Sequence, residues 1–177
     1  MCIRDSPIIH DVCLQNLPVT FCLDRAGLSP NDGPTHHGVF DLSFLRCIPN
    51  ALVMQPKDED ELQDMLFTGI SSGQPAFIRY PRGNGLGVTL KKFPETIEIG
   101  KAEVITEGEI CSIWALGPFV ENAYILAEKL SAKYNLECSL VNVRFVKPLD
   151  VDLLIKHATR HDFIVVLEDN AVSYTHL

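Results

Sequence analysis

The stretch 51–80, ALVMQPKDEDELQDMLFTGISSGQPAFIRY, decides the fold. It begins with the apolar run 51–54 and ends with the apolar run 76–80, and both runs have the length and composition of buried strands. Between them, Asp58 and Glu61 form an N-terminal capping pair. Apolar residues then recur at helical spacing, namely Leu62, Met65, Leu66, Gly69 and Ile70. This order of strand, helix and strand predicts a βαβ unit of a parallel sheet.

The same alternation of strands and helices extends to both sides of this unit. Upstream, residues 18–23 are predicted to form one more strand. Downstream, the Lys-, Pro- and Glu-containing stretch 88–98 has no period and is interpreted as a linker. A second unit is predicted to begin near Ile99, with strands at 110–116, 137–143 and 163–167 and with helices starting at Gly117-Pro118 and at Asp150. The fold class is therefore α/β, with two incomplete parallel-sheet units.

The ends of the chain fit neither unit. Residues 1–6 follow no helical or strand pattern, and residues 173–177 leave the last predicted strand without a following helix. We expect both ends to be non-native, and we expect the chain to be a piece of a longer protein. The expected domains are residues 7–87 and 99–171, joined by the linker 88–98.

Composition restricts the class of protein. Of the 177 residues, 46% are hydrophobic and 21% are charged, which is typical of a globular protein with a core. A formal charge of -8 argues against nucleic acid or an anionic membrane surface as the main partner. No apolar run reaches the roughly 20 residues that a membrane span needs, so we expect a cytoplasmic protein. The six cysteines show no CxxC pair or metal-ligand spacing, and we expect buried free thiols.

Two loops that leave predicted strands carry the candidate site. In open parallel sheets, ligands bind beyond the carboxyl ends of the strands. Arg25 lies in the loop 24–41, Arg82 lies in the loop 79–85, and both are expected at the same edge of one sheet. Two guanidiniums at one crevice can bind phosphate oxygens by charge-assisted hydrogen bonds. In the alternative interpretation, each arginine pairs with a nearby carboxylate such as Asp24 or Asp32.

The histidines allow less specific interpretations. Adjacent residues such as His36 and His37 seldom point both rings at one metal ion, so metal binding is disfavoured. A histidine held in a Gly- and Pro-rich loop is better suited to hydrogen-bonding a substrate oxygen or transferring a proton, unless it is merely exposed. His157 and His161 have no third ligand and are expected to be solvated. The glycine run 83–87 opens no predicted helix and is interpreted as a turn.

Long strings in the sequence carry a resemblance to a known family. DRAG at 24–27 and DGPTHHG at 32–38 resemble the pyrimidine-domain signature shared by transketolases and 1-deoxy-D-xylulose-5-phosphate synthases. FDLSFLRCIPN at 40–50 and IRYPRGNG at 78–85 resemble the synthase family more closely than transketolases. Two further strings resemble the C-terminal domain of the same family, namely VRFVKPLD at 143–150 and EDNA at 168–171.

The resemblance implies a fold, a reaction and roles for four residues. The two units would be part of a transketolase-like pyrimidine domain and part of a transketolase C-terminal-like domain. The family condenses pyruvate with glyceraldehyde 3-phosphate, using thiamine diphosphate and magnesium, in a homodimer that supplies isoprenoid, thiamine and pyridoxal synthesis. By position in the motifs, the substrate-binding residues would be Arg25, Asp32, His36 and Arg82, with His36 also catalytic and the two arginines on the phosphate.

The resemblance also implies what the chain lacks. In the family, the glutamate that activates thiamine and the domain that binds diphosphate and magnesium lie upstream of the matching strings. We therefore expect no cofactor-binding or metal-binding residue here, and we expect the isolated chain to be inactive. Two alternatives stay open: another transketolase-like transferase, and a non-catalytic module that binds a phosphosugar.

Overall fold

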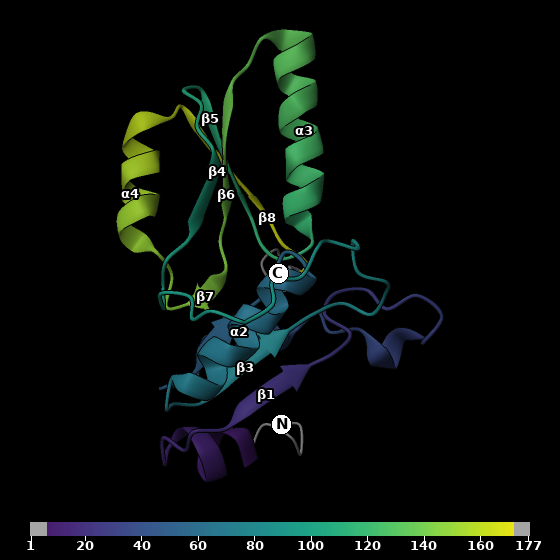
Figure 1. Ribbon diagram of the computed structural model, residues 1–177, viewed down its shortest axis with the longest axis vertical. Coiled ribbons are helices and arrows are strands. Elements are labelled where there is room, and N and C mark those ends of the chain that lie inside the picture. The colour runs from purple at the N-terminus through teal and green to yellow at the C-terminus, as the bar shows by residue number, and fades with distance from the viewer. Residues whose placement is uncertain (1–6, 172–177) are drawn as a thin grey trace, which may run out of the picture.

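The predicted βαβ unit is present in the computed structural model, which describes residues 7–171 (Figure 1). Strand β2 (Leu52–Met54) is followed by helix α2 (Glu59–Ser71) and strand β3 (Ala76–Arg79). The two strands are parallel, with Leu52 opposite Ala76. The Asp58 carboxylate accepts a hydrogen bond of 2.8 Å from the Glu61 amide, so the predicted cap starts the helix.

The first sheet has four strands in the order β1-β3-β2-β7. Strand β1 (Thr20–Leu23) pairs with β3 in parallel, as predicted. Strand β7 (Phe145–Lys147) pairs with β2 in antiparallel orientation, so the prediction of a purely parallel sheet was wrong at this edge. Strand β7 was not predicted, because it is three residues long and lies far beyond the linker. Helix α1 (Asp41–Leu45) and two short helical segments, Pro7–Cys13 and Pro34–His36, complete the unit.

The second sheet has the order β4-β6-β5-β8. Strands β5 (Cys111–Ala115), β6 (Cys138–Asn142) and β8 (Phe163–Leu167) are parallel and were predicted. Strand β4 (Glu103–Thr106) was not predicted and is antiparallel to β6. Helices α3 (Phe119–Tyr134) and α4 (Val151–Arg160) lie on opposite sides of this sheet (Figure 1).

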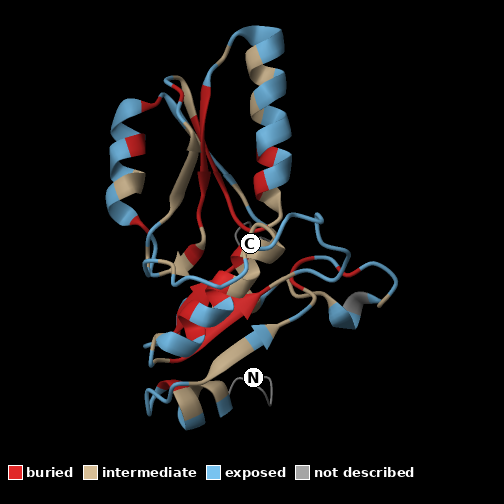
Figure 2. Cartoon of the chain, viewed as in Figure 1, coloured by how far each residue is buried: buried red, intermediate tan, exposed pale blue. Residues whose placement is uncertain are grey.

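Alternation along β5 explains the two helical layers. Ile113 packs with Val120 and Ala123 of α3, whereas Trp114 packs with Leu154 of α4. A central parallel strand is buried on both faces because a helix covers each of them. Strand β8 at the sheet edge differs, since Phe163, Val165 and Val166 are exposed (Figure 2). The α/β fold class with two units is confirmed, and each sheet adds one antiparallel edge strand.

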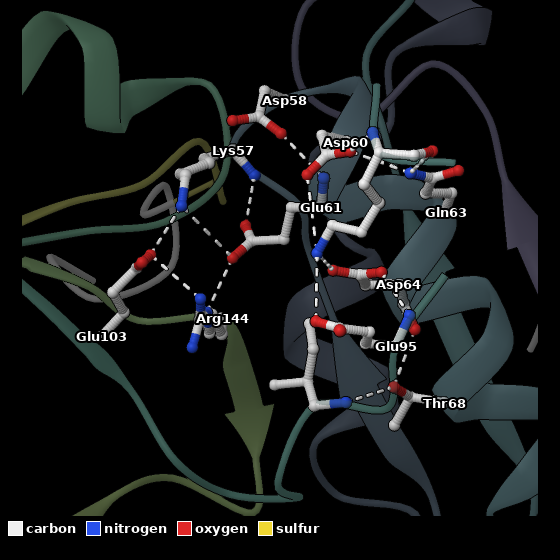
Figure 3. Close-up of polar contacts among 12 residues, drawn as sticks. Lys57, Asp58, Asp60, Glu61, Gln63, Asp64, Thr68, Glu95, Glu103 and Arg144 are labelled. Carbon is white, nitrogen blue, oxygen red and sulfur yellow. Dashed lines mark hydrogen bonds and ion pairs between the residues drawn. The ribbon is translucent and has the colours of Figure 1, made fainter. Parts of the chain in front are cut away.

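The segment 88–98 has no regular secondary structure, but side chains of α2 hold it in place (Figure 3). Asp60 and Asp64 accept hydrogen bonds from the backbone amides of Lys91 and Glu95 at 2.7 and 2.8 Å. The Thr68 hydroxyl accepts another from the Ile97 amide at 2.8 Å. Since side chains from three successive turns of α2 accept hydrogen bonds from its backbone, this segment packs along the helix.

The expectation that His157 and His161 are solvated was wrong. Their side chains are 1% and 7% exposed, and each ring is hydrogen-bonded to a buried serine of the second sheet, Ser112 and Ser139 respectively. Burial lowers the pKa of His157, and the nearby His161 lowers it further. Both histidines face the second sheet, because α4 packs this side of the helix against it. The i, i+4 spacing alone did not indicate which side of the helix would be buried.

The cysteine prediction holds only in part. Five cysteines lie in the described residues, and all five are free thiols. Cys13 and Cys138 are buried, whereas Cys22 and Cys47 are exposed. The expectation of non-native ends concerns residues that lie outside the described range. Within that range, no helix has both the length and the apolar character needed to cross a membrane.

Candidate functional site

The carboxyl ends of β1 and β3 bring the two predicted arginines together. Leu23 and Arg79 are opposite each other in the parallel register, so the following loops leave the sheet at the same edge. Arg25 Nε donates a 2.9 Å hydrogen bond to Asp32 Oδ2, and Arg82 Nη1 donates to the other oxygen of the same carboxylate. Three of the four candidate residues are therefore in direct contact.

Asp32 lies between two positive charges. Hydrogen bonds from Arg82 and then from Arg25 hold the pKa of Asp32 below its usual value. The hydrogen bond to Asp32, with the charge of Asp24, raises the pKa of Arg25. The side chains of Arg25 and Arg82 are 36% and 50% exposed, so solvent and small ions can reach both. The structure thus shows the alternative interpretation, in which the arginines pair with a carboxylate. In this pairing, the two guanidiniums already bind one anionic group together.

The backbone of the loop fixes the position of Arg25. Arg25 has a φ of 62°, a left-handed conformation that costs a residue with a Cβ roughly 1–2 kcal/mol. Gly38 closes the loop by donating its amide to the carbonyls of Arg25 and Gly27, at 3.0 and 2.9 Å. A Cβ at Gly38 would lie 2.4 Å from the Arg25 carbonyl oxygen, so only glycine fits there. Strained residues of this kind gather at functional sites.

The two adjacent histidines have different surroundings. His36 is exposed, its Nδ1 lies 3.1 Å from Thr35 Oγ1, and no contact found among the described residues joins it to Asp32 or either arginine. His37 instead accepts a 2.9 Å hydrogen bond from the Ser29 amide through its Nδ1. His37 therefore braces the loop internally, while the ring of His36 faces solvent.

Arg79, the last residue of β3, was not singled out by the sequence analysis. Its side chain is fully buried, with 0% exposure. It donates two hydrogen bonds to Asp41, at the end of the site loop, and one of 2.6 Å to Asp169, beyond β8. An arginine inside a predicted buried strand was the available signal, because a buried guanidinium needs carboxylate partners.

The second unit reaches the site loop through residues 169–171. The Ala171 amide donates a 2.7 Å hydrogen bond to the Val39 carbonyl, and Asn170 Nδ2 donates one of 2.7 Å to Ser43 Oγ. An open hollow of about 630 Å³ lies between the units. Its lining from the first unit comprises Ala26, Leu28, Val39 and Pro81, and its lining from the second comprises Pro118, Phe119, Asp169, Asn170 and Ala171.

Within residues 7–171, no group of three or more His, Cys, Asp or Glu side chains is arranged to hold a metal ion.

Comparison with known proteins places this geometry in a family. Residues 3–86 match the family Transketolase, pyrimidine binding domain, and residues 100–175 match Transketolase, C-terminal domain. The chain belongs to the transketolase family. The strand edge with Arg25 and Arg82 lies in the pyrimidine-binding part, and Asp169 lies in the C-terminal part.

Individual relatives point to one branch of the transketolase family. The chain is 54% identical over 168 residues to the 1-deoxy-D-xylulose-5-phosphate synthase of Methylacidiphilum infernorum, and 56% identical over 165 residues to that of Aquifex aeolicus. These matches cover 95% and 93% of this chain but 26% of each relative, so the chain spans about a quarter of their length.

A solved structure supports the same fold. The protein described as "Split gene transketolase, inactive beta4 tetramer" superimposes with a TM-score of 0.82 at 27% identity. The match covers 95% of this chain and 54% of that one.

Proposed function

We propose that this chain is the acceptor-phosphate-binding part of a 1-deoxy-D-xylulose-5-phosphate synthase, which condenses pyruvate with glyceraldehyde 3-phosphate. The observation that carries the proposal is the convergence of Arg25 and Arg82 on the two oxygens of Asp32. Two accessible guanidiniums held this close by separate loops form a receptor for an anion with several oxygens. Similarity of 50% or more to several synthases from different bacteria supports the choice of reaction.

Each candidate residue has a distinct role in the proposal. Arg25 and Arg82 bind the phosphate, whose charge of about -1.5 to -2 at pH 7 exceeds that of one carboxylate. Asp32 keeps the two guanidiniums side by side. When the phosphate binds the arginines, the Asp32 carboxylate accepts a hydrogen bond from a hydroxyl of the substrate. His36, whose ring faces solvent, hydrogen-bonds an oxygen of the acceptor at the reacting centre and transfers a proton there.

The cofactors belong to the whole enzyme in this proposal. When bound, thiamine diphosphate would supply the chemistry that makes the two-carbon unit of pyruvate nucleophilic. Thiamine diphosphate and magnesium would be bound mostly by parts of the enzyme other than the described residues. The whole enzyme would be a cytoplasmic homodimer, as the family resemblance implies.

A chimaeric enzyme tests the proposal. Residues 7–171 replace the aligned segment of the Aquifex aeolicus synthase, to which they are closely similar. We expect the chimaera to form 1-deoxy-D-xylulose 5-phosphate from pyruvate and glyceraldehyde 3-phosphate. Arg25→Ala and Arg82→Ala should each raise the KM for glyceraldehyde 3-phosphate by roughly 10- to 150-fold, because a charge-assisted contact to phosphate is lost. The KM for pyruvate should change far less.

Unphosphorylated D-glyceraldehyde separates the roles. Its kcat/KM should change little in the two arginine variants, whereas His36→Ala should lower turnover with both acceptors. Arg160→Ala is the matched control, since Arg160 is an exposed arginine paired with Glu107 in the second unit. Equal losses of kcat/KM for both acceptors in the arginine variants would mean that Arg25 and Arg82 have a structural role and do not bind the phosphate. A folded chimaera without activity would favour the non-catalytic phosphosugar-binding module.

A further inference from the structure

Arg79 uses its entire hydrogen-bonding capacity in a buried cluster. Its Nε and Nη2 donate to the two oxygens of Asp41 at 3.0 Å each, in the paired geometry that a guanidinium and a carboxylate prefer. Its Nη2 also donates to the Gly38 carbonyl at 2.9 Å, and its Nη1 donates to Gln55 Oε1 and Asp169 Oδ1 at 2.5 and 2.6 Å. All five N–H groups of Arg79 thus have partners.

This cluster lies directly behind the phosphate-binding loop. The Gly38 carbonyl that accepts from Arg79 also accepts from the Gly27 amide, and the Gly38 amide donates to the Arg25 carbonyl. A single residue, Gly38, therefore links the guanidinium of Arg79 to the backbone of Arg25. Asp41 fixes the far end of the same loop, because its Oδ1 also accepts from the Leu42 amide at the start of α1.

Asp169 connects the cluster to the second unit. It belongs to the segment that follows β8, 90 residues beyond Arg79 in the chain. Its carboxylate packs against Gly27, where a Cβ would lie 2.4 Å from Asp169 Oδ2. Asp169 therefore contacts both Arg79 and the backbone that carries Arg25. A shift of the second unit would move a charge next to the site loop.

The hydrogen bonds of Arg79 make the second unit part of this arrangement, because Asp169 accepts from its Nη1. Arg79 is 0% exposed, while the side chains of Asp41 and Asp169 are 14% and 15% exposed. Without Asp169, Arg79 keeps the charge of Asp41, but its buried Nη1 keeps only Gln55 as an acceptor, so one N–H group is left without a partner and the neighbouring groups must rearrange. Lysine could not replace Arg79, because its ammonium has three donors and no planar fork.

We propose that Arg79 is a positioning residue that makes the phosphate-binding geometry of Arg25 depend on the docking of the second unit through Asp169. This inference rests on the proposed function of Arg25 and Arg82. It assigns to the C-terminal part of the family fold a task in acceptor recognition, although no residue of that part contacts Arg25 or Arg82 within the described residues.

The test compares alanine substitutions at two adjacent residues in the active chimaera. Asp169→Ala removes the contact with Arg79, and Asn170→Ala removes a contact of the same unit with Ser43 that does not involve Arg79. We expect Asp169→Ala to raise the KM for glyceraldehyde 3-phosphate about 3- to 30-fold. The kinetics with D-glyceraldehyde and the KM for pyruvate should stay within about twofold, and Asn170→Ala should leave all of them unchanged.

A double variant separates positioning from general destabilisation. If Asp169 acts through Arg25, then Asp169→Ala should add little to the KM for glyceraldehyde 3-phosphate when Arg25 is already alanine. Full additivity, equal losses with both acceptors, or an equal effect of Asn170→Ala would overturn the proposal. If Arg25→Ala itself shows no preference for the phosphorylated acceptor, the proposed function fails. If it shows that preference and Asp169→Ala does not, only the positioning role fails.

Discussion

Replacing the buried carboxylate of Glu61 by an amide should destabilise the contact between the two units. Glu61 is 4% exposed and lies in the first turn of α2. Its Oε2 accepts from the Lys57 amide at 2.8 Å, and its Oε1 accepts from Arg144 Nε at 2.7 Å (Figure 3). Its Oε1 also accepts from Asn142 Nδ2 at 2.9 Å. Asn142 and Arg144 come from the second unit, so this carboxylate joins the units.

The magnitude follows from these contacts. In Glu61→Gln, one oxygen becomes an NH₂ group that must face a donor, either the Lys57 amide or the side chains of Asn142 and Arg144. The variant therefore loses a charge-assisted hydrogen bond and gains a donor facing a donor. Arg144 keeps Glu103 at 3.1 Å, which limits the loss. We expect the free energy of unfolding to fall by about 2–4 kcal/mol.

Urea unfolding of the chain, followed by fluorescence of its single tryptophan, measures the change. Trp114 is 2% exposed in β5, so its emission reports the second unit. With a urea dependence of about 2 kcal/mol per molar, the midpoint should fall by roughly 1–2 M. Glu95→Gln is the control, because it makes the same charge change at a side chain that is 79% exposed, and it should cost less than about 0.5 kcal/mol. Equal midpoints for Glu61→Gln and Glu95→Gln would refute the reasoning.

Three further predictions concern acid, cofactor and association. Because the pKa of His157 is lowered in the folded chain, the unfolded chain binds the proton first as the pH falls. The free energy of unfolding should therefore decrease below about pH 6.5. The urea midpoint should depend less on pH between about 7 and 5.5 in His157→Gln than in the unsubstituted chain, and an equal dependence in both would contradict this. The chain alone should bind no thiamine diphosphate by calorimetry, with or without magnesium, and saturable micromolar binding would be the contrary result. Val166 is exposed on the edge strand β8 and should promote association of the chain. Val166→Lys should therefore lower the apparent mass in concentrated solution. A monodisperse monomer of the unsubstituted chain would be the contrary result.

Local patterns made most of the fold predictable. The strands and helices that follow apolar periodicity and capping residues formed within a few residues of their expected bounds, as α2 shows by starting directly after Asp58. Strands β4 and β7 were missed because they are four and three residues long and pair in antiparallel orientation at sheet edges. An edge strand is defined by its partner, and a short one leaves little periodicity in its own sequence.

The site was predictable where strand order brings residues together. Arg25 and Arg82 each follow a parallel strand closely, so their proximity followed from topology, and the pairing with Asp32 was one of the two expected outcomes. Arg79 and Asp169 were not predictable in this way, because their contact spans 90 residues and joins the two units. It depends on how the second sheet docks, which no local pattern encodes.

The same contrast explains why the buried polar residues escaped sequence analysis while the accessible ones did not. Arg25 and Arg82 were found because loops beyond parallel strands are where ligands bind. Arg79, Glu61 and His157 are 0%, 4% and 1% exposed, and a polar side chain is tolerated at such positions only when other segments supply its partners. Their partners come from 83 residues away for Glu61 with Arg144 and from 45 residues away for His157 with Ser112. A polar residue inside an apolar periodic run therefore indicates a long-range contact, and in this chain the contacts of Arg79 and Glu61 are among those that hold the C-terminal unit beside the arginine pair.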